Sequence, residues 1–228
     1  QMEAFVLVSC KKDISTLFPE EAPSSKEKQE ISSQFSHVRT ICGDGNCLYR
    51  AVFFAYLESM IHNDMALAGF KTKTVNMGSE FFIAGLEEDY FIHHLDTVVE
   101  LVDSCQSLRE EALLRLFNQP EFSDSVVQYL RLLASVHLQN NADFFCNFVE
   151  APNLQLYCQH EVERMAREGG HVEIIALTQA LDMSIHIVNM NVQQEHLVHH
   201  VIPEGGEPSL HLLYQSAHYN ILYPRPKA

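Results

Sequence analysis

Residues 47–60, with the sequence CLYRAVFFAYLESM, constrain the fold of this chain more than any other segment. As a helix, this run would be apolar on nearly every face and not along one stripe. Such a helix has to be surrounded by other elements, so we expect it at the centre of a domain. The preceding residues Gly43, Asp44, Gly45 and Asn46 tolerate a tight turn and can cap free backbone N–H groups. The pattern predicts a buried central helix that begins at Cys47.

Two kinds of periodicity follow this helix. Between about residues 79 and 148, apolar residues recur three and four positions apart, which is typical of helices. Beyond residue 182 the pattern changes to short β-type runs separated by glycine, proline and small residues. Helices gathered early and strands gathered late predict an α+β domain, with a helical lobe packed against a mainly antiparallel sheet. The predicted helices are 90–102, 108–117, 123–138 and 171–181, and the predicted antiparallel strands are 184–190, 210–214 and 218–223.

The N-terminal part of the chain differs in composition. A polar stretch rich in Pro, Ser, Lys and Glu at residues 19–30 indicates an exposed loop that leads into a short helix at 27–35. We therefore predict an N-terminal segment at 1–37 and one domain at 38–228, which is long enough to enclose a rigid site.

Charge and hydropathy exclude several classes of partner. The formal charge of −15 would repel a phosphate backbone, so nucleic acid is not an expected partner, whereas a basic protein surface would be attracted. No apolar run reaches the roughly 20 residues that span a bilayer, so we expect no membrane association. The first residues do not resemble a secretory signal, and we expect a monomer in the cytoplasm or the nucleus.

The cysteines and histidines argue against metal binding. The six cysteines contain no Cys-x-x-Cys pair, and without a secretory signal they are interpreted as reduced thiols. His171-Val172-Glu173 resembles part of a zinc deaminase motif, but the Pro-Cys-x-x-Cys that would complete it is missing, so we interpret it as a helix start. Cys146 and Cys158 lie in apolar helical contexts and are expected in the core. We expect no metal and no cofactor.

Cys47 is the candidate nucleophile among the six cysteines. A thiol at a helix N-terminus lies at the positive end of the helix dipole, which favours the thiolate. Amides of Cys47 and of the 44–46 turn could form an oxyanion hole, with the Asp44 carboxylate holding the loop. A base could come from His218-Tyr219-Asn220, because residues two apart on a strand point to the same face. Asn220 could then orient the His218 imidazole as the third member of a triad.

These two motifs resemble the otubain branch of the ovarian-tumour (OTU) deubiquitinases. The similarity includes Gly43-Asp44-Gly45-Asn46-Cys47-Leu48-Tyr49-Arg50-Ala51 and the run from His218 to Tyr223, and it continues through much of the chain. The resemblance implies a papain-like cysteine protease fold without a cofactor, and hydrolysis of the isopeptide bond between the ubiquitin C-terminus and a lysine. It implies these roles: Cys47 is the nucleophile, His218 the base and then the acid, Asn220 the orienter, and Asp44 a loop residue.

The resemblance also indicates partners. The segment from His200 to Gly205 matches part of the ubiquitin-binding surface in relatives, so His200, Pro203 and Glu204 are candidate contacts with ubiquitin or polyubiquitin chains. Some otubains have Asp where this chain has Asn220. We expect the neutral Asn220 to stabilise the imidazolium of His218 less than a carboxylate would. Met2 is compatible with a natural start without the long N-terminal arm of some otubains, and linkage preference stays open. The alternative function is inhibition by binding ubiquitin or a ubiquitin-conjugating enzyme without catalysis.

Overall fold

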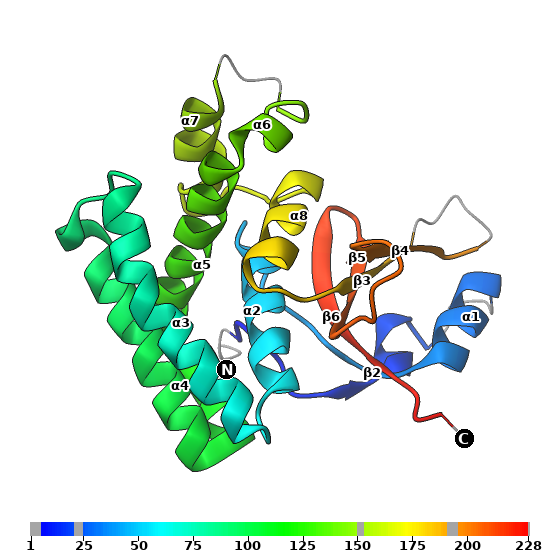
Figure 1. Cartoon of the computed structure of the whole chain (residues 1–228). Coiled ribbons are helices and arrows are strands. Elements are labelled where there is room, and N and C mark those ends of the chain that lie inside the picture. The colour runs from blue at the N-terminus through cyan, green and yellow to red at the C-terminus, as the bar shows by residue number, and fades with distance from the viewer. Residues whose placement is uncertain (1–5, 21–24, 150–152, 191–195, 228) are drawn as a thin grey trace.

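The apolar run forms the central helix of the molecule. A computed structural model describes residues 6–20, 25–149, 153–190 and 196–227, and helix α2 (Cys47–Ser59) begins at the predicted residue. Ten of its side chains are buried, because α2 lies between a helical lobe and a sheet (Figure 1). The predicted α+β architecture is confirmed. Among the described residues, no helix has the length and apolar character needed to cross a membrane.

Three long helices build the lobe on one side of α2 (Figure 1). They are α3 (Asp64–Ile83), α4 (Glu88–Phe117) and α5 (Pro120–Asn140). The two predicted helices at 90–102 and 108–117 are one element, α4, which is broken at Arg109, where φ is 53°. Most of α3 was not predicted, because exposed apolar residues such as Met65 and Val75 blur its periodicity.

Shorter helices complete the described part of the chain. α1 (Lys26–Gln34) confirms the predicted N-terminal helix, and α8 (His171–Ala180) confirms the helix that follows Gly169-Gly170. The others are the 3₁₀ turn η1 (Ile14–Leu17), α6 (Ala142–Phe145), α7 (Leu154–Tyr157) and the π-helical turn η2 (Cys158–Val162).

The sheet has six strands in the order β1-β2-β6-β5-β3-β4. Four neighbouring pairs are antiparallel, but β3 and β5 are parallel, so the prediction that the three C-terminal strands pair antiparallel was wrong for this pair. The reason is β4, which was not predicted because most of its residues are exposed and its His199-His200 pair interrupts the apolar pattern. The chain runs back along β4 at the edge and then crosses over to β5 on the other side of β3. The strands are β1 (Lys12–Asp13), β2 (Phe35–Arg39), β3 (Ile185–Asn189), β4 (Val198–Ile202), β5 (Leu210–Gln215) and β6 (His218–Pro224).

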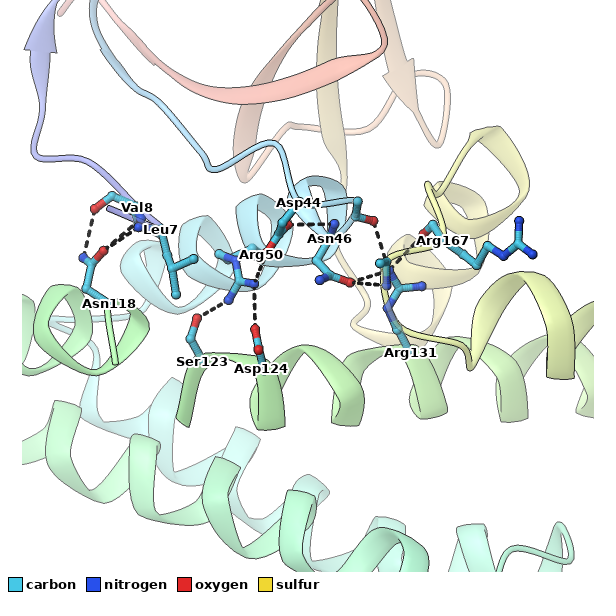
Figure 2. A network of polar contacts seen from close by, with 12 residues as sticks. Leu7, Val8, Asp44, Asn46, Arg50, Asn118, Ser123, Asp124, Arg131 and Arg167 are labelled. Carbon is cyan, nitrogen blue, oxygen red and sulfur yellow. Dashed lines mark hydrogen bonds and ion pairs between the residues drawn. The ribbon is translucent and has the colours of Figure 1, made fainter. Parts of the chain in front are cut away.

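The N-terminal segment is integrated into both layers. The predicted boundary between residues 37 and 38 falls inside β2, which pairs with β6. Closer to the N-terminus, the Asn118 side chain accepts hydrogen bonds from the amides of Leu7 and Val8 at 2.9 and 3.0 Å and donates to the Val8 carbonyl (Figure 2). Segment 6–20 therefore joins the sheet through β1 and the lobe through Asn118.

The second face of the sheet, away from α2, carries three connected histidines. His186 on β3 lies 2.8 Å (Nδ1 to Nδ1) from His211 on β5 and 2.9 Å (Nε2 to Nδ1) from His199 on β4. Phe35 stacks on the His186 ring. Burial, together with these two histidines, lowers the pKa of His186 to about 4.

This histidine cluster predicts a loss of stability in mild acid. Below its ordinary pKa of 6.5, His186 binds a proton in the unfolded chain but stays neutral in the folded protein until about pH 4. The contribution of His186 to the free energy of unfolding is therefore complete above pH 6.5 and decreases as the pH falls toward 4. We expect the urea midpoint to fall across this window, and to fall less in His186→Phe. Urea unfolding between pH 7.5 and 4.5 tests this, with His160→Phe, a change at an exposed histidine, as the control. An equal decrease of the urea midpoint with pH in all three proteins would contradict the prediction.

Candidate active site

Cys47 is the first residue of α2 and is largely buried, with 6% of its surface exposed. It therefore lies where the positive end of the helix dipole is strongest. In the preceding turn, Asp44 Oδ1 accepts a hydrogen bond from the Asn46 amide at 2.9 Å. Asp44 is thus bonded to its own loop, and the Asn46 amide, which is engaged in this bond, drops out of the predicted set of oxyanion donors. The Cys47 amide stays in that set.

His218 and Asn220 lie together on β6, as their spacing predicts. A two-residue turn, Ser216-Ala217, joins β5 to β6, and both residues have the positive φ that such hairpin turns require. Asn220 Oδ1 lies 3.0 Å from His218 Nε2 and accepts a hydrogen bond from the Ile41 amide at 2.9 Å. The Ile41 N–H can only donate, so it fixes which end of the carboxamide is the oxygen. His218 must then donate from Nε2, which leaves Nδ1 as the basic nitrogen.

His218 also interacts with Cys47. Nδ1 of His218 faces the turn before α2, since a Cβ on Gly43 would lie 3.8 Å from it. A hydrogen bond with the Cys47 side chain raises the pKa of His218, and this effect outweighs the opposing effect of burial. The Coulombic effect of Cys47 and the hydrogen bond with Asn220 raise the pKa further. The structure thus brings the predicted nucleophile, base and orienter together.

Arg50 connects the turn to the helical lobe (Figure 2). Its side chain is completely buried one helical turn after Cys47, and Nη2 lies 3.0 Å from Asp44 Oδ2 and 2.9 Å from Asp124 Oδ1. Nη1 donates to Ser123 Oγ at the start of α5. Asp44 therefore has one carboxylate oxygen on the turn and the other on Arg50, which fixes its rotamer.

The remaining cysteines are not equivalent. Burial raises the pKa of Cys105 and of Cys158 to about 12, which makes both thiols inert near neutral pH. Cys146 was predicted in the core but is exposed, because it follows the short helix α6 at the surface. Cys10 is exposed as well.

The predicted ubiquitin contacts lie along a groove on another part of the molecule. His200 is an exposed residue of β4, and Pro203 and Glu204 follow that strand. The three side chains line a groove of about 960 Å³ together with Ile175 and Gln179 of α8. Within the described ranges, no group of three or more His, Cys, Asp or Glu side chains is placed to hold a metal ion.

Two buried arginines were not predicted to support the site. Arg50 belongs to the motif around Cys47, but the sequence does not indicate which residues it binds, because Ser123 and Asp124 lie more than 70 positions away. Arg131 interrupts the apolar sequence of α5, and a charged residue at the centre of a buried helix is the signal that could have indicated a role.

A thiol at the start of a central helix, interacting with a histidine that a side-chain carboxamide orients, defines a papain-like cysteine protease of the OTU class. The model of the Peptidase C65 Otubain family matches residues 1–224. Ubiquitin thioesterase OTUB2 of Mus musculus is 40% identical, covering 98% of this chain and 98% of that protein. Ubiquitin thioesterase OTUB1 of Homo sapiens is 35% identical, covering 95% of this chain and 83% of that protein. The chain belongs to the otubain family, as its motifs predicted.

Solved structures confirm the fold. The structure of a ceOTUB1 ubiquitin aldehyde UBC13~Ub complex contains a chain with a TM-score of 0.89 and 24% identity, with 98% of this chain and 96% of that chain covered. A chain of a second structure, h/ceOTUB1-ubiquitin aldehyde-UBC13~Ub, has a TM-score of 0.89 and 24% identity, with 97% of this chain and 92% of that chain covered. The match extends over both layers of the molecule.

The contact between Cys47 and His218 predicts a measurable shift. In Cys47→Ala the hydrogen bond that contributes most to the raised pKa of His218 is lost, so this pKa should fall. An NMR titration of the histidine ring signals measures it. The signals of His211, which lies on β5 and is held by His186, serve as the internal reference and should titrate alike in both proteins. An unchanged His218 titration would mean that the thiol and the imidazole do not interact.

Gly45 predicts a steric effect on the same site. Its φ is +86°, and a Cβ would lie 2.3 Å from the Ala166 carbonyl oxygen. Gly85 has a φ of +95° but open space around it. Gly85→Ala should therefore cost only the strain of a left-handed residue, roughly 1–2 kcal/mol, whereas Gly45→Ala should also displace the turn and lower peptidase activity at least about tenfold. Chemical denaturation and peptidase assays measure both effects, and equal activity in the two variants would contradict this account.

Proposed function

We propose that this chain is a deubiquitinating cysteine protease that hydrolyses the isopeptide bond between the C-terminal glycine of ubiquitin and a lysine of another ubiquitin or a substrate. The observation that carries the proposal is that Cys47 at the start of α2 interacts with His218 of β6, whose imidazole is hydrogen-bonded to Asn220. Relatives named ubiquitin thioesterases, matched over nearly the whole chain, support ubiquitin as the substrate.

The proposed mechanism gives each residue a step. His218 accepts the Cys47 proton at Nδ1, and the thiolate attacks the carbonyl carbon of the terminal glycine. The Cys47 amide at the positive end of α2 stabilises the oxyanion that forms. His218 then donates the proton to the departing lysine amine, leaving a thioester. Water, activated by the neutral His218, attacks the thioester and restores the thiol.

The groove between β4 and α8 is proposed to bind the body of ubiquitin. It combines exposed polar side chains from His200 and Glu204 with apolar surface from Ile175 and Ile202. Such a mixture suits a protein surface that is apolar at its centre and charged at its rim. We propose that His200, Pro203 and Glu204 contact ubiquitin there.

The proposal predicts selective labelling of one thiol. A ubiquitin probe with a C-terminal electrophile should modify Cys47 and leave Cys10 and Cys146 unmodified, although these two thiols are exposed. The selectivity follows because Cys47 has the adjacent imidazole. Intact mass and peptide mapping measure it. Cys47→Ser should abolish labelling, and persistent labelling of that variant would rule out the assignment.

A panel of di-ubiquitin linkages, read by gel, gives the matching activity test. We expect cleavage of at least one linkage by the wild type and none by Cys47→Ala. The competing function is binding of ubiquitin or a conjugating enzyme without catalysis. That function would be established if Cys47→Ala changed ubiquitin conjugation as strongly as the wild type while no linkage was cleaved.

A further inference from the structure

Arg131 lies in the middle of α5, is completely buried, and reaches the turn before Cys47 from below (Figure 2). Its Nη2 donates to Asn46 Oδ1 at 2.7 Å and to the Gly45 carbonyl at 3.2 Å. The same nitrogen donates to the Arg167 carbonyl at 2.9 Å, and Nη1 donates to the Val162 carbonyl at 3.1 Å. One guanidinium therefore links α5 to the nucleophile turn and to the segment after η2.

The turn and that segment also contact each other directly. Asn46 Oδ1 accepts a second hydrogen bond from the Ala166 amide at 2.9 Å, and the backbone of Ala166 fills the space beside Gly45. The Asn46 side chain is thus held by two donors from different parts of the chain. Because Asn46 is the residue before Cys47, its orientation sets the direction of the peptide that carries the Cys47 N–H.

We propose that Arg131 is a positioning residue for hydrolysis at Cys47: it fixes the Gly45 carbonyl and the Asn46 side chain so that the Cys47 amide points at the developing oxyanion. The inference rests on the proposed function. Arg131 does not touch the reacting atoms, and it acts through Asn46.

The chemistry of the side chain favours this role over simple packing. Arg131 binds four neutral oxygens, three through Nη2 and one through Nη1, so its planar fork of donors reaches the nucleophile turn and the end of η2 at once. The Tyr49 ring lies 4.1 Å from the guanidinium carbon and supports its plane. Burying a charge is costly unless its donors find partners; Nη1 and Nη2 find theirs in this arrangement of the turn, while the buried Nε has none.

The chain contains a matched control. Arg39 is also buried, and its guanidinium donates to Tyr223 Oη at 2.7 Å, to the Ser9 carbonyl at 2.9 Å and to Glu58 Oε2 at 3.2 Å. These partners lie away from the nucleophile turn. Arg39→Met thus removes a buried guanidinium with three hydrogen bonds, one of them an ion pair with Glu58, but without the proposed positioning role.

The experiment compares Arg131→Met, Arg39→Met and the wild type in the full chain. Hydrolysis of a fluorogenic ubiquitin C-terminal amide gives kcat and KM, thermal unfolding gives stability, and peptide-resolved iodoacetamide alkylation reports the reactivity of the Cys47 thiol. Because alkylation forms no oxyanion, we expect Arg131→Met to lose kcat by about 100-fold with KM and the alkylation rate close to wild type. Arg39→Met should lose comparable stability and keep its kcat.

Several results would overturn the proposal. If Arg131→Met keeps its kcat, or if kcat and alkylation fall together in both arginine variants, Arg131 is structural only. If Arg131→Met does not fold, Asn46→Ala decides the matter, because it removes the side-chain oxygen that Arg131 and Ala166 bond and leaves Arg131 and the Gly45 carbonyl in place. A selective loss of kcat supports positioning, and an unchanged kcat refutes it. A wild type that cleaves no ubiquitin substrate would refute the proposed function and this inference with it.

Discussion

Two completely buried guanidinium groups hold the turn on which the active site depends. Arg50 binds Asp44 and the start of α5, and Arg131 binds Gly45 and Asn46 from the middle of α5. A buried charge without partners costs several kcal/mol, so the fold is favoured only when the turn presents these oxygens in place. The rigid helix α5 thereby sets the shape of the turn, and the start of α2 cannot shift without breaking charged hydrogen bonds.

The segment from residue 41 to residue 46 joins this lobe to the sheet. At one end the Ile41 amide bonds Asn220 on β6 and the Cys42 amide bonds the Leu7 carbonyl. At the other end Asp44 bonds Arg50 of α2, and Asn46 bonds Arg131 of α5 in the lobe. Nucleophile and base come from different layers, and this short segment, bonded to both, fixes their separation. The catalytic geometry of the deubiquitinase is therefore a property of how α2 packs on β6.

Local sequence patterns predicted the parts of the site that local physics determines. The start of α2 follows from a glycine-rich turn before an apolar run, and the shared face of His218 and Asn220 follows from strand periodicity. Partners distant in sequence leave no local trace, so the bonds of Arg50 to Asp124 and of Arg131 to Asn46 could not be predicted. The parallel pairing of β3 and β5 escaped for a related reason: it depends on β4, an exposed edge strand whose His199-His200 pair lacks apolar alternation. β2 was not predicted either, because its pairing with β6 is equally non-local, and the predicted boundary between residues 37 and 38 therefore fell inside this strand.

Asn220 raises the question of how this site stabilises an imidazolium with a neutral orienter. A carboxylate at this position would offer charge as well as geometry, but the carboxamide oxygen already accepts from both Ile41 and His218, which fixes the tautomer. Charge stabilisation must then come mainly from elsewhere, and the order of the effects on the pKa of His218 identifies the source: Cys47 contributes most and Asn220 less. The positive charge on His218 is stabilised chiefly by the nucleophile it activates, and Asn220 chiefly supplies orientation. The interaction depends on how close the two side chains lie, so the position of α2 against β6 sets how strongly Cys47 acts on His218.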